Sequence, residues 1–179
     1  MPNYLLDKNV VRRTIEGIAQ AQRGEPIRPD RSACLVLLHA AVQHRFGAYI
    51  TPQSLHVLQQ LAAQPEVKDF LAEVSVIQVS RYARRWARRL REHGFTREDA
   101  VVLSLGTFGT DATGSVLGVD SVVTLDLALI NNFYVRHDLL DRRLRAMTRQ
   151  LPTPFRGVSL PAVWQVTQAL AELPPERPL

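Results

Sequence analysis

The sequence has a single cysteine and no hydrophobic run long enough to cross a membrane. Cys34 cannot form an internal disulfide, and its apolar, helix-like surroundings predict a core residue instead of a nucleophile. The longest apolar run, residues 33–42, is interrupted by His39 and is shorter than the roughly 20 residues that a spanning helix needs. The N-terminus lacks the pattern of a secretory leader. We therefore expect a cytoplasmic protein without membrane contacts.

Several common catalytic and metal-binding motifs are absent as well. Residues 106–109 (GTFG) are not followed by Lys and then Ser or Thr, which excludes a P-loop. No Gly-x-Ser-x-Gly sequence occurs, so the usual nucleophile elbow of hydrolases is excluded. The five histidines show no ligand spacing with the cysteine and form no His-x-x-x-His pair, so a zinc site is not expected.

What the chain does have is an excess of positive charge on an ordinary globular composition. It contains 22 Lys and Arg against 17 Asp and Glu, a net charge of +5. This balance permits nucleic acid as a partner but does not by itself identify one. With 179 residues and 46% hydrophobic content, we expect one domain with a substantial core.

Apolar, β-branched stretches alternate with helix-like periodicity, which predicts an α/β fold with a mostly parallel central sheet. We expect one domain over residues 1–150, followed by a C-terminal helix and proline-rich tail over 151–179. The expected strands are residues 3–6, 48–51, 74–79 (a strand or an extended connector), 121–124 and 133–135. The expected helices are residues 10–22, 31–45, 52–64, 81–93, 96–105, 138–150 and 158–170, with a loop over 107–118.

Three acidic residues stand at the ends of strands or the starts of helices. Asp7 follows the strand at 3–6, Asp126 closely follows the strand at 121–124, and Asp99 lies in the first turn of a helix. In a parallel sheet these positions share one rim, so the three carboxylates are expected to meet there. Mg²⁺ or Mn²⁺ would offset their repulsion and could activate a water. The alternative is that each acid only caps a helix or makes a turn.

Four short motifs follow one another along the sequence: residues 5–10 (LLDKNV), 51–55 (TPQSL), 98–100 (EDA) and 122–126 (VVTLD). Taken in order, they resemble those of PIN-domain ribonucleases, a family that includes the toxins of bacterial type II toxin–antitoxin pairs, and the resemblance covers residues 3–135. The resemblance implies a three-layer α/β/α sandwich whose acidic pocket binds Mg²⁺ or Mn²⁺ and cuts RNA. It also implies an antitoxin-like protein partner and a homodimer.

Carried over by position, the resemblance makes Asp7, Asp99 and Asp126 the metal-binding and catalytic acids. Asn9 matches the small polar residue that often follows the first acid. Thr124 matches the hydroxyl residue that precedes the last acid.

Two departures from the family pattern bear on catalysis. The family usually has a glutamate in the helix after the second strand, where this sequence has Val57, which cannot hold a metal. Gln53 and Gln60 are nearby but are weaker ligands. The second departure is an insertion over residues 107–118, whose Asp111 is either a substitute ligand or a turn residue.

Arginines gather on one side of the helix expected over 81–93. At 100° per residue they lie opposite apolar side chains that would pack on the core, and only Glu92 offers an opposite charge. A helix face with almost only positive charges predicts binding of RNA phosphates, although an acidic protein would fit the same surface. The predicted RNA-binding residues are Arg81, Arg84, Arg85, Arg88 and Arg89.

Two functions agree with these residues. The first is a metal-dependent endoribonuclease in which Asp7, Asp99 and Asp126 hold Mg²⁺ or Mn²⁺, which activates water for attack on an RNA phosphodiester. The second is a PIN-like fold that has lost catalysis and binds RNA or protein, and Val57 favours this alternative. A third interpretation is an unrelated α/β domain whose acids are only caps and turns.

Overall fold

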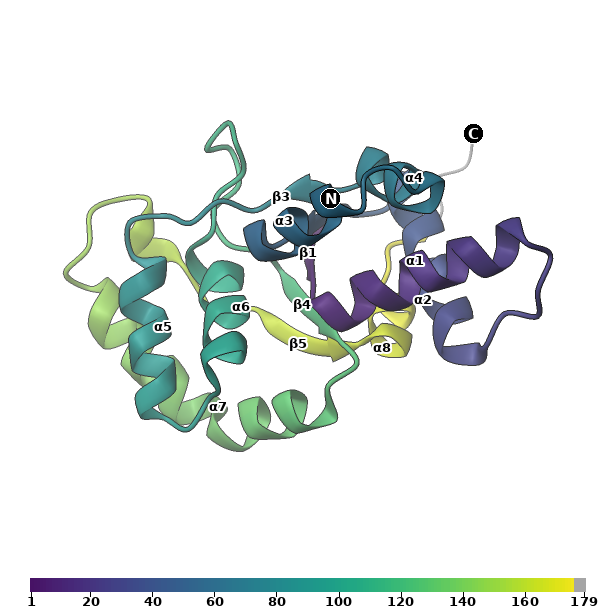
Figure 1. Ribbon diagram of the computed structural model, residues 1–179. Helices are drawn as coiled ribbons and strands as arrows, with labels where there is room; N and C mark the ends of the chain where they lie inside the picture. Colours follow the sequence, from purple (N-terminus) through teal and green to yellow (C-terminus); the bar gives the residue numbers. More distant parts are fainter. Residues whose placement is uncertain (176–179) are drawn as a thin grey trace.

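The computed structural model describes residues 1–175, and its centre is a sheet of five parallel strands (Figure 1). The strand order is β3-β2-β1-β4-β5, so the first strand of the chain lies in the middle. Because every neighbouring pair is parallel, the carboxyl ends of the strands share one edge of the sheet. The strands are β1 (Asn3–Leu6), β2 (Gly47–Ile50), β3 (Ser75–Val76), β4 (Ser121–Thr124) and β5 (Ala162–Gln165).

Helices connect the strands and cover both faces of the sheet. They are α1 (Lys8–Gln22), α2 (Pro29–Val42), α3 (Pro52–Gln60), α4 (Pro65–Glu73), α5 (Ala83–Glu92), α6 (Arg97–Phe108), α7 (Leu127–Thr148) and α8 (Val166–Ala171), with a 3-10 helix, η1 (Phe155–Gly157).

The alternating side chains of the strands divide the interior into two cores. Tyr4 and Leu6 of β1 belong to one core, together with residues of α1, α2, α4 and α8. Leu5 points the other way and belongs to the core formed with α5, α6 and α7. Figure 1 shows these two groups of helices on opposite sides of the sheet. The predicted α/β class with a parallel sheet is confirmed, and the arrangement is compatible with a three-layer sandwich.

Four helices begin next to the carboxyl edge of the sheet, and a side chain caps each of them. Asp7 caps α1, Thr51 caps α3, Thr96 caps α6 and Asp126 caps α7. Each capping oxygen accepts a hydrogen bond from a backbone N–H that has no partner inside the helix. At α1, α3 and α7, the residue that caps the helix therefore also follows the end of a strand directly or closely.

The structure differs from two of the elements expected from the sequence. Residues 133–135 are not a strand but lie inside α7, which is a single helix of 22 residues. Its buried Leu129, Phe133, Leu140 and Leu144 are four, seven and four residues apart, which is the spacing of one helical face. The aromatic and β-branched residues 133–135 suggest a buried strand, but Val135 is 80% exposed. The helix expected over 52–64 is present as α3 but ends at Gln60, and the next helix, α4, was not expected from the sequence.

The C-terminal segment contributes a strand that the sequence analysis missed. Residues 158–170 were expected to form one helix, but residues 162–165 form β5 and only the end of that range is helical. β5 pairs in parallel with β4, and Val163 is fully buried against the sheet. The strand is short and follows Pro161, so its own sequence gives little indication of a strand. Its pairing with β4, which is distant in the sequence, stabilises it. The predicted tail residues 176–179 lie outside the described residues.

Candidate active site at the edge of the sheet

Asp7 lies at the carboxyl end of the central strand and is held there by three hydrogen bonds. Its side chain is buried, with 5% exposure for the residue. One carboxylate oxygen accepts the backbone N–H of Lys8 at 2.7 Å, and the other accepts the Thr124 hydroxyl at 2.8 Å and the Asn9 amide at 3.5 Å. Asn9 and Thr124, the two polar residues that the resemblance selects, therefore both contact Asp7. Asp7 is a helix cap and also a fixed, largely desolvated carboxylate.

Thr124 links the first acid to the last one. Its hydroxyl donates to Asp7 and accepts the backbone N–H of Asp126 at 3.0 Å. Asp126 in turn caps α7, because one of its carboxylate oxygens accepts the N–H groups of Ala128 and Leu129 at 2.8 and 3.1 Å. A fully buried hydroxyl thus couples the ends of β1 and β4.

Asp99 enters the same region from the first turn of α6. Thr96 caps this helix by accepting the backbone N–H of Asp99 at 3.1 Å. The side chain of Asp99 is free of this capping interaction and is partly exposed. The cap therefore fixes the backbone of the first turn, and the carboxylate is left to face the space between α6 and β1.

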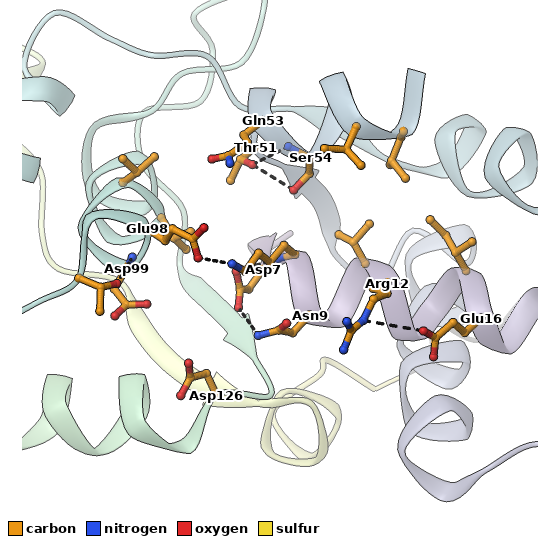
Figure 2. Close-up of a pocket in the computed structure, with 18 of the residues that line it drawn as sticks. Asp7, Asn9, Arg12, Glu16, Thr51, Gln53, Ser54, Glu98, Asp99 and Asp126 are labelled. Atoms are coloured by element: carbon orange, nitrogen blue, oxygen red, sulfur yellow. Dashed lines mark hydrogen bonds and ion pairs between the residues drawn. The ribbon is translucent and has the colours of Figure 1, made fainter. Parts of the chain in front are cut away.

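A cavity of about 850 Å³ brings these acids together (Figure 2). Asp7, Asp99 and Asp126 all line it, as the sequence predicts, together with residues of α1 and α3. Glu98 also lines it, although the sequence analysis did not select this residue. Its position directly before Asp99 in the sequence is the feature that could have identified it. We refer to this space as the acidic cavity.

Lys8 places a positive charge at the rim of the acidic cavity. Its ammonium group forms an ion pair with Glu98, which Figure 2 draws between α1 and α6. This hydrogen bond raises the pKa of Lys8, so the lysine stays charged at neutral pH. One acid of the rim is therefore neutralised within the protein, while Asp7, Asp99 and Asp126 have no lysine or arginine at ion-pair distance among residues 1–175.

Burial has a direct electrostatic consequence for Asp7. Desolvation raises the pKa of its carboxyl group above the ordinary value. The bonds from Thr124 and the Lys8 N–H and the charge of Lys8 oppose this shift, whereas the Asp99 carboxylate increases it. Asp7 and Asp99 are thus close enough for one negative charge to disfavour the other.

The carboxylate oxygens of the acidic cavity are suitable ligands for a hard divalent cation, although the acids are not tightly clustered. Within residues 1–175, no three His, Cys, Asp or Glu side chains are close enough to form a ready ligand cluster. Mg²⁺ does not require such a cluster, because it commonly keeps several waters and binds through one or two carboxylates. Asp7, Asp99 and Asp126 all line the cavity, and the negative charge of Asp99 is among the causes that raise the pKa of Asp7.

Apolar residues form the far wall of the acidic cavity. Val57 of α3 is 50% exposed and lines the cavity with Ile15 of α1 and Leu61, just beyond α3. The position where the family resemblance implies a glutamate therefore does face the same space, but with an apolar side chain. Gln53 also lines the cavity, whereas Gln60 is not among its lining residues and lies within hydrogen-bond distance of His56.

Asp111 does not replace the missing acid. It lies in the loop after α6, where its carboxylate accepts hydrogen bonds from the Thr113 hydroxyl and from the backbone N–H of Val116. These bonds lower its pKa, and the residue is not among those that line the acidic cavity. Of the two interpretations of Asp111, the structure supports the turn residue.

The arginine-rich segment lies apart from the acidic cavity. α5 packs beside α6 (Figure 1). It buries Ala83, Trp86 and Leu90 and exposes its arginines. Arg81 precedes the helix, and its guanidinium lies 5.6 Å from the ring centre of Tyr82. The described lining of the acidic cavity includes none of the five predicted RNA-binding residues, which are Arg81, Arg84, Arg85, Arg88 and Arg89.

Cys34 is a core residue, as predicted. It is buried in α2, and desolvation raises the pKa of its thiol to about 11, so the thiol stays protonated at neutral pH. Among the described helices, none combines the length and apolar character that crossing a membrane requires.

Comparisons with protein-family models, with curated proteins and with solved structures found no match for this chain.

Proposed function

We propose that the protein is a Mg²⁺- or Mn²⁺-dependent endoribonuclease and that the acidic cavity is its active site. The observation that carries this proposal is the state of Asp7, a carboxylate that is 5% exposed, bonded by Thr124 and Asn9, and aimed into a cavity shared with Asp99 and Asp126. A buried acid with a raised pKa in a cavity is typical of a functional site, because burial of a charge is costly for folding alone. RNA as substrate rests on the resemblance to PIN-domain ribonucleases.

In this proposal Asp7 and Asp99 would hold the cation, with Asp126 facing it from the end of β4. When bound, the cation would lower the pKa of a water molecule and offset negative charge on a phosphate oxygen. The residues of the chain prepare this site. Thr124 keeps the Asp7 carboxylate in one orientation, and the bonds of Asp126 to the start of α7 fix its position. Lys8 neutralises Glu98, which reduces the repulsion that an incoming phosphate meets.

A second candidate is a binding module without catalysis. It is favoured by Val57, which gives the cavity an apolar wall where the resemblance implies a fourth acid. It is also favoured by the open spacing of the acids, since no group of three forms a ready ligand cluster within residues 1–175. A protein of this kind would bind its partner without a need for divalent cations.

Calorimetric titration with Mn²⁺ separates the two candidates. We expect the wild-type protein to bind Mn²⁺ and Asp99→Asn to weaken binding by about tenfold or more, because the variant removes one negatively charged ligand. Asp111→Asn is the matched control: it removes the same charge outside the cavity and should leave binding unchanged. Cleavage of single-stranded RNA should follow the same order. Absence of Mn²⁺ binding by the wild type would contradict the ribonuclease proposal.

A further inference from the structure

Two helices on the side of the sheet away from α1 and α2 form a second, smaller cavity. It measures about 260 Å³ and lies between α5 and α7. Arg85 and Arg89, one helical turn apart on α5, line one wall, and Arg143 of α7 lines the other. We refer to it as the basic groove. Sequence periodicity identified the arginines of α5, but only the fold shows that Arg143 faces the same space.

The positive charge of the basic groove is largely uncompensated. Arg89 forms an ion pair with Glu92 at 2.9 Å. Within residues 1–175, Arg85 and Arg143 have no carboxylate at ion-pair distance. Positive charges on both helices act on Glu92. The hydrogen bond from Arg89 lowers the pKa of Glu92 most, and the charge of Arg143 on α7 also lowers it. Three guanidinium groups thus face one carboxylate, a surplus that favours an anionic ligand.

The surface of the basic groove favours phosphates over a protein partner. Protein interfaces usually centre on exposed aromatic or large aliphatic anchors. Among the described residues, the exposed large apolar side chains all lie elsewhere, and the Trp86 in the groove wall is fully buried. Among the described residues that line the groove, none is an exposed Phe, Tyr or Trp, so the groove offers no such ring for a base to stack on. What remains are guanidinium groups, which bind phosphate oxygens with two parallel hydrogen bonds.

We propose that the basic groove binds the phosphate backbone of single-stranded RNA at a distance from the acidic cavity, an inference that rests on the proposed ribonuclease function. Asp126 and Arg143 are 17 residues apart along α7, and at 1.5 Å per residue this places them about 25 Å from each other. At 3.4 Å per stacked nucleotide, about seven nucleotides span that distance. RNA of that length or longer engages both sites, and shorter RNA engages only one.

RNA binding measured in EDTA tests the groove without cleavage. The probe is a fluorescein-labelled single strand of about 20 nucleotides, long enough to reach both sites. The test variant is the triple substitution Arg85→Gln, Arg89→Gln and Arg143→Gln. The control is Arg28→Gln, Lys68→Gln and Arg156→Gln, which removes the same charge from exposed positions outside the groove. Circular dichroism verifies that both variants are folded.

We expect the groove variant to lose about tenfold or more in affinity while the control stays near the wild type. The slope of log affinity against log salt should fall by about 2, because three phosphate contacts contribute about 0.7 each. Equal losses in both variants would overturn the proposal, as would a wild type that binds poly-glutamate but not RNA. Since EDTA removes the cation, failure here leaves the Mn²⁺ titration of the acidic cavity unaffected.

Discussion

The acidic cavity and the basic groove hold their charges in different ways. Asp7 is buried, bonded by Thr124 and Asn9, and carries a raised pKa. Arg85 and Arg143 are exposed on helix surfaces and have no ion-pair partner among residues 1–175. Fixing a buried charge requires hydrogen bonds that are built into the fold. An exposed guanidinium needs no such support.

This difference indicates what each region can do. A carboxylate fixed at the end of a strand can position a cation within a fraction of an ångström, as chemistry on a bound substrate requires. Flexible arginines on a helix surface attract phosphates from a distance and tolerate many sequences and geometries. We therefore propose that the acidic cavity carries out the chemistry and that the basic groove captures the substrate. Each prediction below compares a residue of one of these regions with a similar residue outside it.

The largest effect is expected from Asp7→Asn. The variant keeps the shape of the side chain but removes the buried negative charge, so RNA cleavage with Mn²⁺ should fall by at least about 100-fold. Asp111→Asn, in the loop after α6, should cleave like the wild type because Asp111 only organises its turn. The measurement is single-turnover cleavage of labelled RNA. Equal rates for Asp7→Asn and the wild type would remove Asp7 from the mechanism.

Thr124→Val should lower the free energy of unfolding by about 1–3 kcal/mol. The substitution preserves size but deprives the buried Asp7 carboxylate of a donor and the Asp126 N–H of an acceptor. Thr113→Val makes the same change in an exposed loop and should stay within about 0.5 kcal/mol of the wild type. Urea denaturation measures both. A smaller loss for Thr124→Val than for Thr113→Val would show that the bond to Asp7 adds nothing to stability.

The sequence predicted the parts of the fold that local patterns determine. The alternation of Tyr4, Leu5 and Leu6 between two cores follows from strand geometry, and Thr96 caps α6 as its position indicates. The aromatic and β-branched residues 133–135 predict a strand, because such residues are common in strands. Burial along α7 instead repeats every three to four residues, which is the period of a helix. β5 depends on β4, a partner about 40 residues away in the chain, so no local pattern could have identified it.

The candidate site was predictable to a similar extent. Topology alone brings Asp7, Asp99 and Asp126 to one edge of the sheet, and the structure places all three in one cavity. The ion pair between Lys8 and Glu98 joins two elements 90 residues apart, and sequence contains no direct information on such contacts. The opposite wall of the basic groove was missed for the same reason.

Val57→Glu is expected to strengthen the acidic cavity. Val57 is 50% exposed in the cavity wall, so a carboxylate there stays hydrated and adds a fourth oxygen donor. We expect Mn²⁺ affinity to rise by about tenfold, since affinity for hard cations follows the number of charged ligands. Val36→Glu on α2 is the control, because Val36 is 53% exposed and lies outside the cavity. Equal affinities for the two variants, measured by calorimetry, would mean that the α3 wall does not face the cation.

The smallest effect concerns the pH dependence of stability in EDTA. Because burial raises the pKa of Asp7 in the folded protein, its protonated form is favoured there. The resulting stability is present below the ordinary Asp pKa of about 4 and is lost as the pH rises through the raised value. Asp7→Asn carries a neutral group of the same shape at every pH. The two unfolding free energies should therefore coincide in acid, and the variant should become the more stable protein toward neutral pH.

Arg85→Gln completes this last comparison. This variant removes a charge outside the acidic cavity, so the difference in unfolding free energy between it and the wild type should not follow the trend of Asp7→Asn. Urea denaturation of the three proteins at a series of pH values gives both difference curves. If Asp7→Asn became the less stable protein as the pH rises, the bonds from Thr124 and Lys8 would outweigh the cost of burial. The Asp7 carboxylate would then stabilise the fold, and its burial would no longer argue for a functional role.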